Sequence, residues 1–369
     1  DCALGEFVMS WPTWLPLREA LRPMSPYGAP QVPAQASLNT NENPYSPSPA
    51  LQKAITDAVA KVAADLNRYP DRDATVLRTK IAAYINEFSG TQFSADNVWA
   101  ANGSNEIIQS IFLAFAGGAV LGFTPSYSMH PLIAKVTGAH WVDGKRNVDF
   151  SLNTSGAIAQ IHENKPTLTF ITTPNNPTGG AVTIDEIQKL AEACKAVGGL
   201  LVVDEAYAEF SQEKSAVTLI ANNPHVIVIR TMSKAFAFAG ARVGYLVSDV
   251  AVKDAMMIVR LPYHLSALTQ AAAEVAIDYR SQLLGGVNDL IQSRAIVVLA
   301  LHDLGLVTVP SSANFVLFSG FKQEAPQLWA ALLEKGVLIR DVGLSGYLRV
   351  TIGNEAENTL FISALKELI

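Results

Sequence analysis

The chain has 369 residues and a mass of 39.5 kDa, which is enough for two or three domains with substantial cores. Hydrophobic residues make up 49% of it and charged residues 16%, a balance that excludes general disorder. Lys and Arg total 27 against 33 for Asp and Glu, a net charge of −6, and this mild acidity argues against nucleic acid as a main partner. So low a charged fraction also predicts that another subunit covers part of the surface.

Cysteine content and hydrophobic runs bear on compartment and membrane association. The two cysteines, Cys2 and Cys194, are too few for a disulfide framework or a thiolate metal cluster, and they favour a reducing, cytoplasmic compartment. No uninterrupted run of about 18 apolar residues occurs, so we expect no membrane span. Residues 1–10 lack a basic segment followed by an apolar one, so we expect no secretory signal there.

The first half of the chain changes from a proline-rich segment to alternating strands and helices. Residues 1–45 predict an extended arm with one short helix at 15–21. Apolar residues at helical spacing then predict helices over 51–62 and 75–88. Beyond them we expect strands at 98–101, 119–123, 168–172, 200–203 and 226–229, and helices at 106–115, 156–162 and 184–197. This alternation predicts an α/β fold with a largely parallel sheet covered by helices on both faces.

After about residue 268 the pattern becomes that of a second, α+β region. A long helical stretch at 269–304 contains Gly285 and Gly286, which we expect to divide or kink it. We expect strands near 306–309, 314–317 and 348–351 and helices at 325–335 and 355–368. The predicted organisation is an N-terminal arm (1–45) packing with the small domain and a partner subunit, a large domain (46–268) and a small C-terminal domain (269–369).

Polar residues follow the predicted strands, at the sheet edge where ligands bind in such folds. Asn176 follows 168–172, Asp204 and Tyr207 follow 200–203, and Lys234 follows 226–229. Asn176, Asp204 and Lys234 also have ordinary structural alternatives, as a turn residue, a cap and a surface lysine respectively.

A fourth strand, 98–101, leads into Gly103-Ser104-Asn105 at a helix start, which could be a cap or an anion site. Taken together, a phosphate-binding helix end, a carboxylate, a phenol, an amide and a desolvated lysine favour pyridoxal 5′-phosphate as cofactor.

Longer motifs carry a resemblance that runs from about residue 17 to the end of the chain. Those shared by a whole class are Pro-Asn-Asn-Pro-Thr-Gly at 174–179, Asp-Glu-Ala-Tyr at 204–207 and Ser-Lys-Ala-Phe at 233–236. Narrower ones are Ser-Pro-Tyr-Gly at 25–28, Leu-Asn-Thr-Asn-Glu-Asn-Pro at 38–44, Arg-Tyr-Pro-Asp at 68–71, Leu-Pro-Tyr-His-Leu-Ser at 261–266, Ile-Arg-Asp at 339–341 and Leu-Arg-Val-Thr-Ile-Gly at 348–353. The sequence resembles the fold-type I aminotransferases and, within them, the histidinol-phosphate aminotransferases.

The resemblance implies a role for each cofactor residue. Lys234 would bind pyridoxal phosphate covalently and then shuttle the substrate proton, while Asp204 would keep the pyridine nitrogen protonated. Asn176 and Tyr207 would hydrogen-bond the ring oxygen, and Tyr127 would stack on the ring. The phosphate would be held by Ser104, Asn105, Thr231, Ser233 and Arg242, and by Tyr69 of the other subunit, which makes a homodimer the catalytic unit.

The resemblance also implies the substrate residues. Arg349 would bind the carboxylate of glutamate, and Arg340 with Tyr27 would help to bind the phosphate of histidinol phosphate. Arginine suits both because its planar fork pairs with either anion. The alternative is that both arginines form structural ion pairs, and Arg340 is followed directly by Asp341. His264 fits a structural role better than acid–base chemistry, which the lysine performs in such enzymes.

The implied reaction converts L-histidinol phosphate and 2-oxoglutarate to imidazole-acetol phosphate and glutamate, in histidine biosynthesis. Alternatives are an aromatic amino-acid aminotransferase of the same branch, a pyridoxal phosphate decarboxylase or lyase, and a non-catalytic binding protein of the same fold. The turns at 116–119 and 341–348 are short for the family, which affects loop shape but removes no expected ligand residue.

Overall fold

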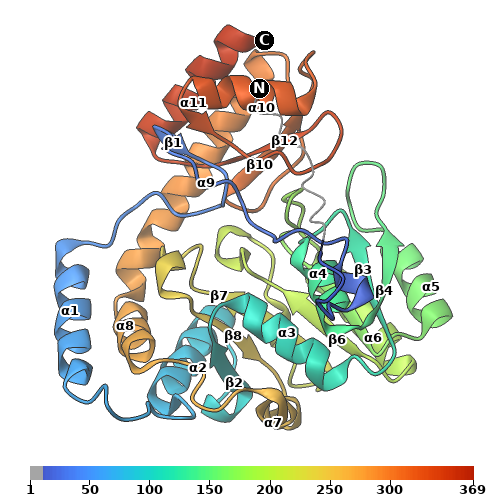
Figure 1. The fold of residues 1–369 in the computed structure, drawn as a ribbon, viewed down its shortest axis with the longest axis vertical. Helices are drawn as coiled ribbons and strands as arrows, with labels where there is room; N and C mark the ends of the chain where they lie inside the picture. The colour runs from blue at the N-terminus through green and yellow to red at the C-terminus, as the bar shows by residue number, and fades with distance from the viewer. Residues whose placement is uncertain (1–10) are drawn as a thin grey trace.

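The computed structural model describes residues 11–369 and is built around a seven-stranded sheet (Figure 1). The strand order is β2-β8-β7-β6-β5-β3-β4. The strands are β2 (Val98–Ala101), β3 (Ala119–Thr124), β4 (His140–Lys145), β5 (Leu168–Thr172), β6 (Leu200–Asp204), β7 (Val226–Thr231) and β8 (Gly244–Val247). Strands β3 to β7 are parallel, and β8 runs antiparallel to both β7 and β2. The carboxyl ends of β5, β6 and β7 therefore lie side by side.

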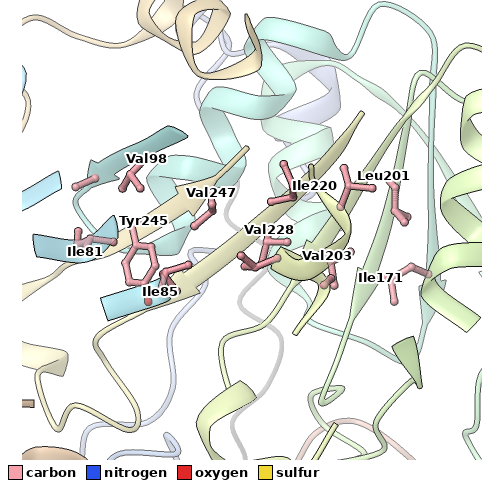
Figure 2. Close-up of a cluster of buried hydrophobic side chains, with 14 of the residues drawn as sticks. Ile81, Ile85, Val98, Ile171, Leu201, Val203, Ile220, Val228, Tyr245 and Val247 are labelled. Carbon is pink, nitrogen blue, oxygen red and sulfur yellow. The ribbon is translucent and has the colours of Figure 1, made fainter. Parts of the chain in front are cut away.

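Buried side chains cover both faces of this sheet, because successive strand residues point to opposite sides. Val98 belongs to the core on one face and Trp99 to the core on the other. The first core, shown in part in Figure 2, is closed by α2 (Thr75–Ser89), α5 (Thr154–Asn164), α6 (Ile184–Ala196) and α8 (Ala267–Asp278). The second is closed by α3 (Ser104–Phe115), α4 (Met129–Thr137) and α7 (Val250–Val259). Each large apolar side chain buried here contributes about 1.5–3 kcal/mol, so the sheet is a firm base for the residues at its edge.

The C-terminal residues form a separate core around a three-stranded antiparallel sheet. Strand β10 (Phe315–Ser319) lies between β9 (Val307–Thr308) and β12 (Leu348–Thr351). Helices α9 (Arg280–Asp303), α10 (Ala325–Glu334) and α11 (Glu355–Leu368) pack with this sheet. Figure 1 shows α9 running from the level of the large sheet up to this region.

The N-terminal arm joins the two regions. Strand β1 (Ala36–Ser37) pairs in parallel with β11 (Val337–Leu338), and α1 (Pro49–Ala63) then lies against α8. Nearer its start, the arm contacts α4 through a hydrogen bond from Arg18 to the Val136 carbonyl. The proposed domain boundaries remain predictions, as does the contact between the arm and a partner subunit. The expectation that residues 1–10 carry no secretory signal, and Cys2, lie outside the described residues.

Two predictions about helices are wrong. The expected helix at 15–21 is shortened to a 3-10 helix at Glu19–Leu21, which ends where the backbone N–H of Arg22 bonds the Glu19 carbonyl. The stretch at 269–304 is divided at Tyr279 rather than at the glycine pair, and α9 continues through Gly285 and Gly286. At Gly286 the absence of a side chain leaves room for Tyr45, since an added Cβ would lie 3.2 Å from the ring of Tyr45.

The alternating strands and helices in the middle of the chain are confirmed, and several elements were not foreseen. These are β4, α4, α7, the short β1–β11 pair and the antiparallel β8. Among residues 11–369, α9 is the one helix long and apolar enough to span a membrane by length and composition. Its buried side chains, Val287, Leu290, Val297 and Leu301, belong to the C-terminal core, which accounts for part of its apolar character.

Candidate active site

A cavity of about 370 Å³ lies at the carboxyl ends of β5, β6 and β7. The structure brings to it all but one of the side chains predicted for the site. Those that line it are Tyr27, Ser104, Asn105, Tyr127, Asn176, Asp204, Tyr207, Thr231, Ser233, Lys234, Arg242, Arg340 and Arg349. The residues come from the arm, the large sheet and the C-terminal sheet, so the cavity depends on how all three pack together.

Lys234 follows β7 and is held by the arm. Its Nζ donates a hydrogen bond to the carbonyl of Thr40 at 2.8 Å. Burial lowers the pKa of this lysine to about 8, and the nearby guanidinium of Arg349 adds to the effect. The amine is therefore neutral in a large fraction of molecules near pH 8, which is the form that acts as a nucleophile or a base.

Asp204 ends β6 as a buried carboxylate whose two oxygens have different partners. Oδ1 accepts a hydrogen bond from the backbone N–H of Ala206 at 3.2 Å. Oδ2 lies 3.2 Å from Nε2 of His130, and both side chains are almost fully buried. The orientation of the carboxylate is thus fixed, and such a group at the cavity wall is suited to bind a cationic heterocycle.

Tyr207, Asn176 and Tyr127 also line the cavity. The hydroxyl of Tyr207 accepts a hydrogen bond from Nδ2 of Asn41 at 2.9 Å, and burial raises its pKa to about 12. The Oδ1 of Asn176 accepts a hydrogen bond from Arg349. Tyr127 donates to Oδ1 of Asn105 at 3.0 Å, and burial raises its pKa well above the usual value. Both phenols therefore keep their protons at neutral pH.

An anion cradle forms where α3 begins. Its residues are Ser104, Asn105, Thr231, Ser233 and Arg242, and Gly103 precedes the helix with no side-chain cap. At Gly103 an added Cβ would lie 2.5 Å from Nη2 of Arg242, so glycine is required for the guanidinium to approach the helix end. Free N–H groups, hydroxyls and a guanidinium at one helix N-terminus make a phosphate site.

The two C-terminal arginines lie opposite each other, since the backbone groups of Arg340 and Arg349 pair at 2.9 Å in both directions. Arg349 is 6% exposed and donates to the carbonyl of Asn39 at 2.7 Å. Its Nε is buried and has no hydrogen-bond partner among the described residues, so a donor remains for a ligand. Burial lowers the pKa of Arg349 to about 10, which leaves it a cation at neutral pH. Within residues 11–369 neither arginine forms a salt bridge.

Tyr69 is the predicted site residue that does not line the cavity. It is 79% exposed and stacks on Tyr263, with ring centroids 4.3 Å apart. His264 lies outside the cavity, where its Nε2 bonds the carbonyl of Ala100 at 2.7 Å, in agreement with a structural role.

Sequence reasoning missed two contributions to the site. The first is the arm segment 39–42, which lines the cavity and was noted only as a motif. The second is His130, which follows Tyr127 by three residues and reaches Asp204. The available sequence signal for His130 was a histidine among the apolar residues of 129–137. That pattern does not identify Asp204 as the partner of the histidine.

Comparison with known proteins finds relatives that cover nearly the whole chain. The family model described as aminotransferase class I and II matches residues 33–365. Histidinol-phosphate aminotransferase of Mycolicibacterium smegmatis is 51% identical over 357 residues, which cover 96% of this chain and 93% of that protein. That of Rhodococcus opacus is 50% identical over 357 residues, covering 96% and 93%. The crystal structure of histidinol-phosphate aminotransferase from Sinorhizobium meliloti in complex with pyridoxal-5′-phosphate matches with a TM-score of 0.79 and 25% identity, over 91% of this chain and 90% of that one.

Proposed function

The chain belongs to the class I and II aminotransferases and, within them, to the histidinol-phosphate aminotransferases. From this premise we propose that it transfers the amino group of L-histidinol phosphate to 2-oxoglutarate. The products are imidazole-acetol phosphate and L-glutamate, and the step belongs to histidine biosynthesis. The observation that carries the proposal is a single cavity that combines Lys234 and Asp204 with the anion cradle and two arginines free of salt bridges within the described residues.

The cavity fits pyridoxal 5′-phosphate, the cofactor of this family. The anion cradle at the start of α3 suits its phosphate, and Gly103 is required there because Arg242 closes on the helix end. Asp204 would hold its ring nitrogen, and Tyr127 would lie against its ring. The partly deprotonated amine of Lys234 would bind its aldehyde carbon. When bound, the cofactor supplies an electron sink for the charge that develops at the substrate α-carbon.

The residues of the chain then divide the work of the reaction. The amine of Lys234, whose pKa burial lowers to about 8, would act as the general base that takes the proton from the substrate α-carbon and carries it on its Nζ. Asp204, held in place by His130, would face the ring nitrogen of the cofactor. Arg349 and Arg340 orient the anionic ends of the two substrates.

The test of the proposed function is coupled turnover with 2-oxoglutarate as the acceptor. We expect kcat/KM for histidinol phosphate to exceed that for phenylalanine, tyrosine and leucine at least about 100-fold, or about 2.7 kcal/mol of discrimination. Equal or faster turnover of the aromatic amino acids would move the function to an aromatic aminotransferase. Turnover without any oxo-acid acceptor would move it to a lyase or decarboxylase.

We propose in addition that two copies form the catalytic unit, with Tyr69 reaching the cofactor phosphate of the partner subunit. The support is that Tyr69 lies outside the cavity of its own chain yet carries a phenol suited to a phosphate. It stacks on Tyr263, and the nearby Leu66 and Leu261 are 52% and 71% exposed. Exposed apolar side chains of this kind support a contact region here.

Mixing two inactive variants tests this arrangement. We expect Lys234→Ala and Tyr69→Ala to be nearly inactive alone. Refolded together in equal amounts, they should regain roughly a quarter of wild-type activity, since half the dimers are mixed and each mixed dimer has one intact site. No recovery, in a mixture that sedimentation shows to contain dimers, would contradict a shared site.

We also propose a cytoplasmic location, because the low cysteine content suits a reducing compartment.

A further inference from the structure

The segment Asn39 to Asn41 contacts three functional side chains of the site through successive residues. The Asn39 carbonyl accepts from Arg349, and the Thr40 carbonyl accepts from Lys234. Nδ2 of Asn41 donates to the hydroxyl of Tyr207 at 2.9 Å. The first two contacts use the backbone alone, whereas the third needs the Asn41 side chain.

The orientation of the Asn41 amide is set by Thr351. The Oγ1 of Thr351 accepts a hydrogen bond from the Asn41 backbone N–H at 3.0 Å. The hydroxyl of Thr351 in turn donates a hydrogen bond to Oδ1 of Asn41, also at 3.0 Å. With Oδ1 occupied as an acceptor, the NH₂ group faces Tyr207, and an amide NH₂ can only donate. A third contact, from Asn314 to the Asn41 carbonyl at 3.1 Å, further anchors the residue.

This arrangement determines where the Tyr207 proton points. The phenol is 4% exposed and its ring is held edge-on to Phe315, with centroids 5.1 Å apart. Since its oxygen accepts from Asn41, its own O–H must donate elsewhere, and no residue of 11–369 accepts it. Tyr207 lines the cavity, so the free direction for that proton is into the cavity.

We propose that Asn41 is a positioning residue that directs the hydroxyl proton of Tyr207 into the cofactor cavity, in an orientation fixed by Thr351. Burial keeps Tyr207 protonated at neutral pH, so the proton is available to the ring oxygen of bound pyridoxal phosphate. The inference rests on the proposed function only in taking that cofactor as the occupant.

The backbone at Asn41 allows a clean test. Its φ is +57°, in the left-handed region where glycine is the least costly residue. The Asn41→Gly variant therefore removes the amide without straining the chain. Asn41→Asp keeps the shape and the Thr351 contact but presents an acceptor to Tyr207, which should turn the phenol proton away from the cavity.

The readout is the visible absorbance of the bound cofactor as a function of pH, without substrate. A hydrogen bond donated to the ring oxygen of the cofactor stabilises the negative charge on that oxygen. The oxygen then holds the proton of the nitrogen that joins the cofactor to Lys234 less strongly, and the pKa of that nitrogen falls. Losing the donor therefore raises the pH at which that proton leaves. We expect this midpoint to rise by about one unit in Asn41→Asp and by less in Asn41→Gly.

Both substitutions are repeated in a Tyr207→Phe background as the matched control. If Asn41 acts through the Tyr207 hydroxyl, they should move the midpoint there by less than roughly 0.3 unit. An equal shift in both backgrounds, or no shift with Tyr207 present, would overturn the proposal. If Asn41→Asp fails to fold, comparing Asn41→Gly in the presence of Tyr207 with Asn41→Gly in the Tyr207→Phe background still tests the proposal. Because no substrate is used, failure of the wild-type protein to act on histidinol phosphate would refute the proposed function and leave this test standing.

Discussion

Replacing Lys234 with alanine is expected to reduce transamination at least about 10⁴-fold, the upper range for loss of a general acid–base group, while the chain stays folded. Lys234 makes one hydrogen bond, to a backbone carbonyl, and is otherwise exposed to the cavity rather than packed in a core. Its removal leaves the sheet and its two cores untouched. The measurement is kcat in the coupled assay, with circular dichroism to establish the fold.

The exposed Lys195 at the end of α6 provides a matched control for the loss of a lysine. Lys195→Ala should keep full activity, because that residue does not line the cavity. Turnover near the wild-type rate in Lys234→Ala would refute the assignment of Lys234.

The same variant also carries a pH signature in the protein without cofactor. The pKa of Lys234 is lowered from 10.5 to about 8 in the folded chain, so between these values the unfolded chain binds more protons. Stability contributed by this group therefore rises with pH across that window, by about 3 kcal/mol for a shift of that size. The free energy of unfolding of Lys234→Ala should lack this increase, and denaturant titrations at pH 7.5 and 10.5 would measure the difference.

The chemistry-bearing residues were predictable because they follow buried strands directly. Asp204 closes the apolar run of β6, and Lys234 comes three residues after β7. The parallel arrangement then brings them to one edge whatever the loops do. Strand β8 was not predicted at all, because the apolar run at 244–247 is only four residues long, and nothing in it indicates its antiparallel direction.

Contacts between distant segments were beyond sequence reasoning. His130 reaches Asp204 across 74 positions, and Asn41 reaches Tyr207 across 166. Neither side chain has a local pattern that names its partner, because the contact exists only after α4 and the arm have packed on the sheet. The exposed position of Tyr69 outside its own cavity is likewise a product of the fold, and its use by a partner subunit remains a prediction.

The second large effect is expected when Arg349 or Arg340, the two arginines proposed to bind the substrates, is replaced. We expect Arg349→Gln to raise KM for glutamate at least about 30-fold, because truncating one partner of a buried charge pair costs roughly 2 kcal/mol or more. Arg349 is buried beside Asn176 and keeps its unpartnered Nε close to the reaction centre. Arg340 is more exposed and makes only backbone contacts to Arg349 in this region. Arg340→Gln should therefore weaken the binding of histidinol phosphate more than the binding of glutamate.

Single-turnover half-reactions separate the two arginines, since each amino donor can be mixed alone with the cofactor-loaded enzyme. Opposite preferences in the two variants would show that the arginines divide the anionic groups between them. Equal losses for both donors in both variants would instead indicate a structural role. The Arg349→Lys variant sharpens the distinction: it keeps the positive charge but loses the planar fork. If charge alone positions glutamate, Arg349→Lys will recover most of the affinity, and if paired hydrogen bonds do so, it will resemble Arg349→Gln.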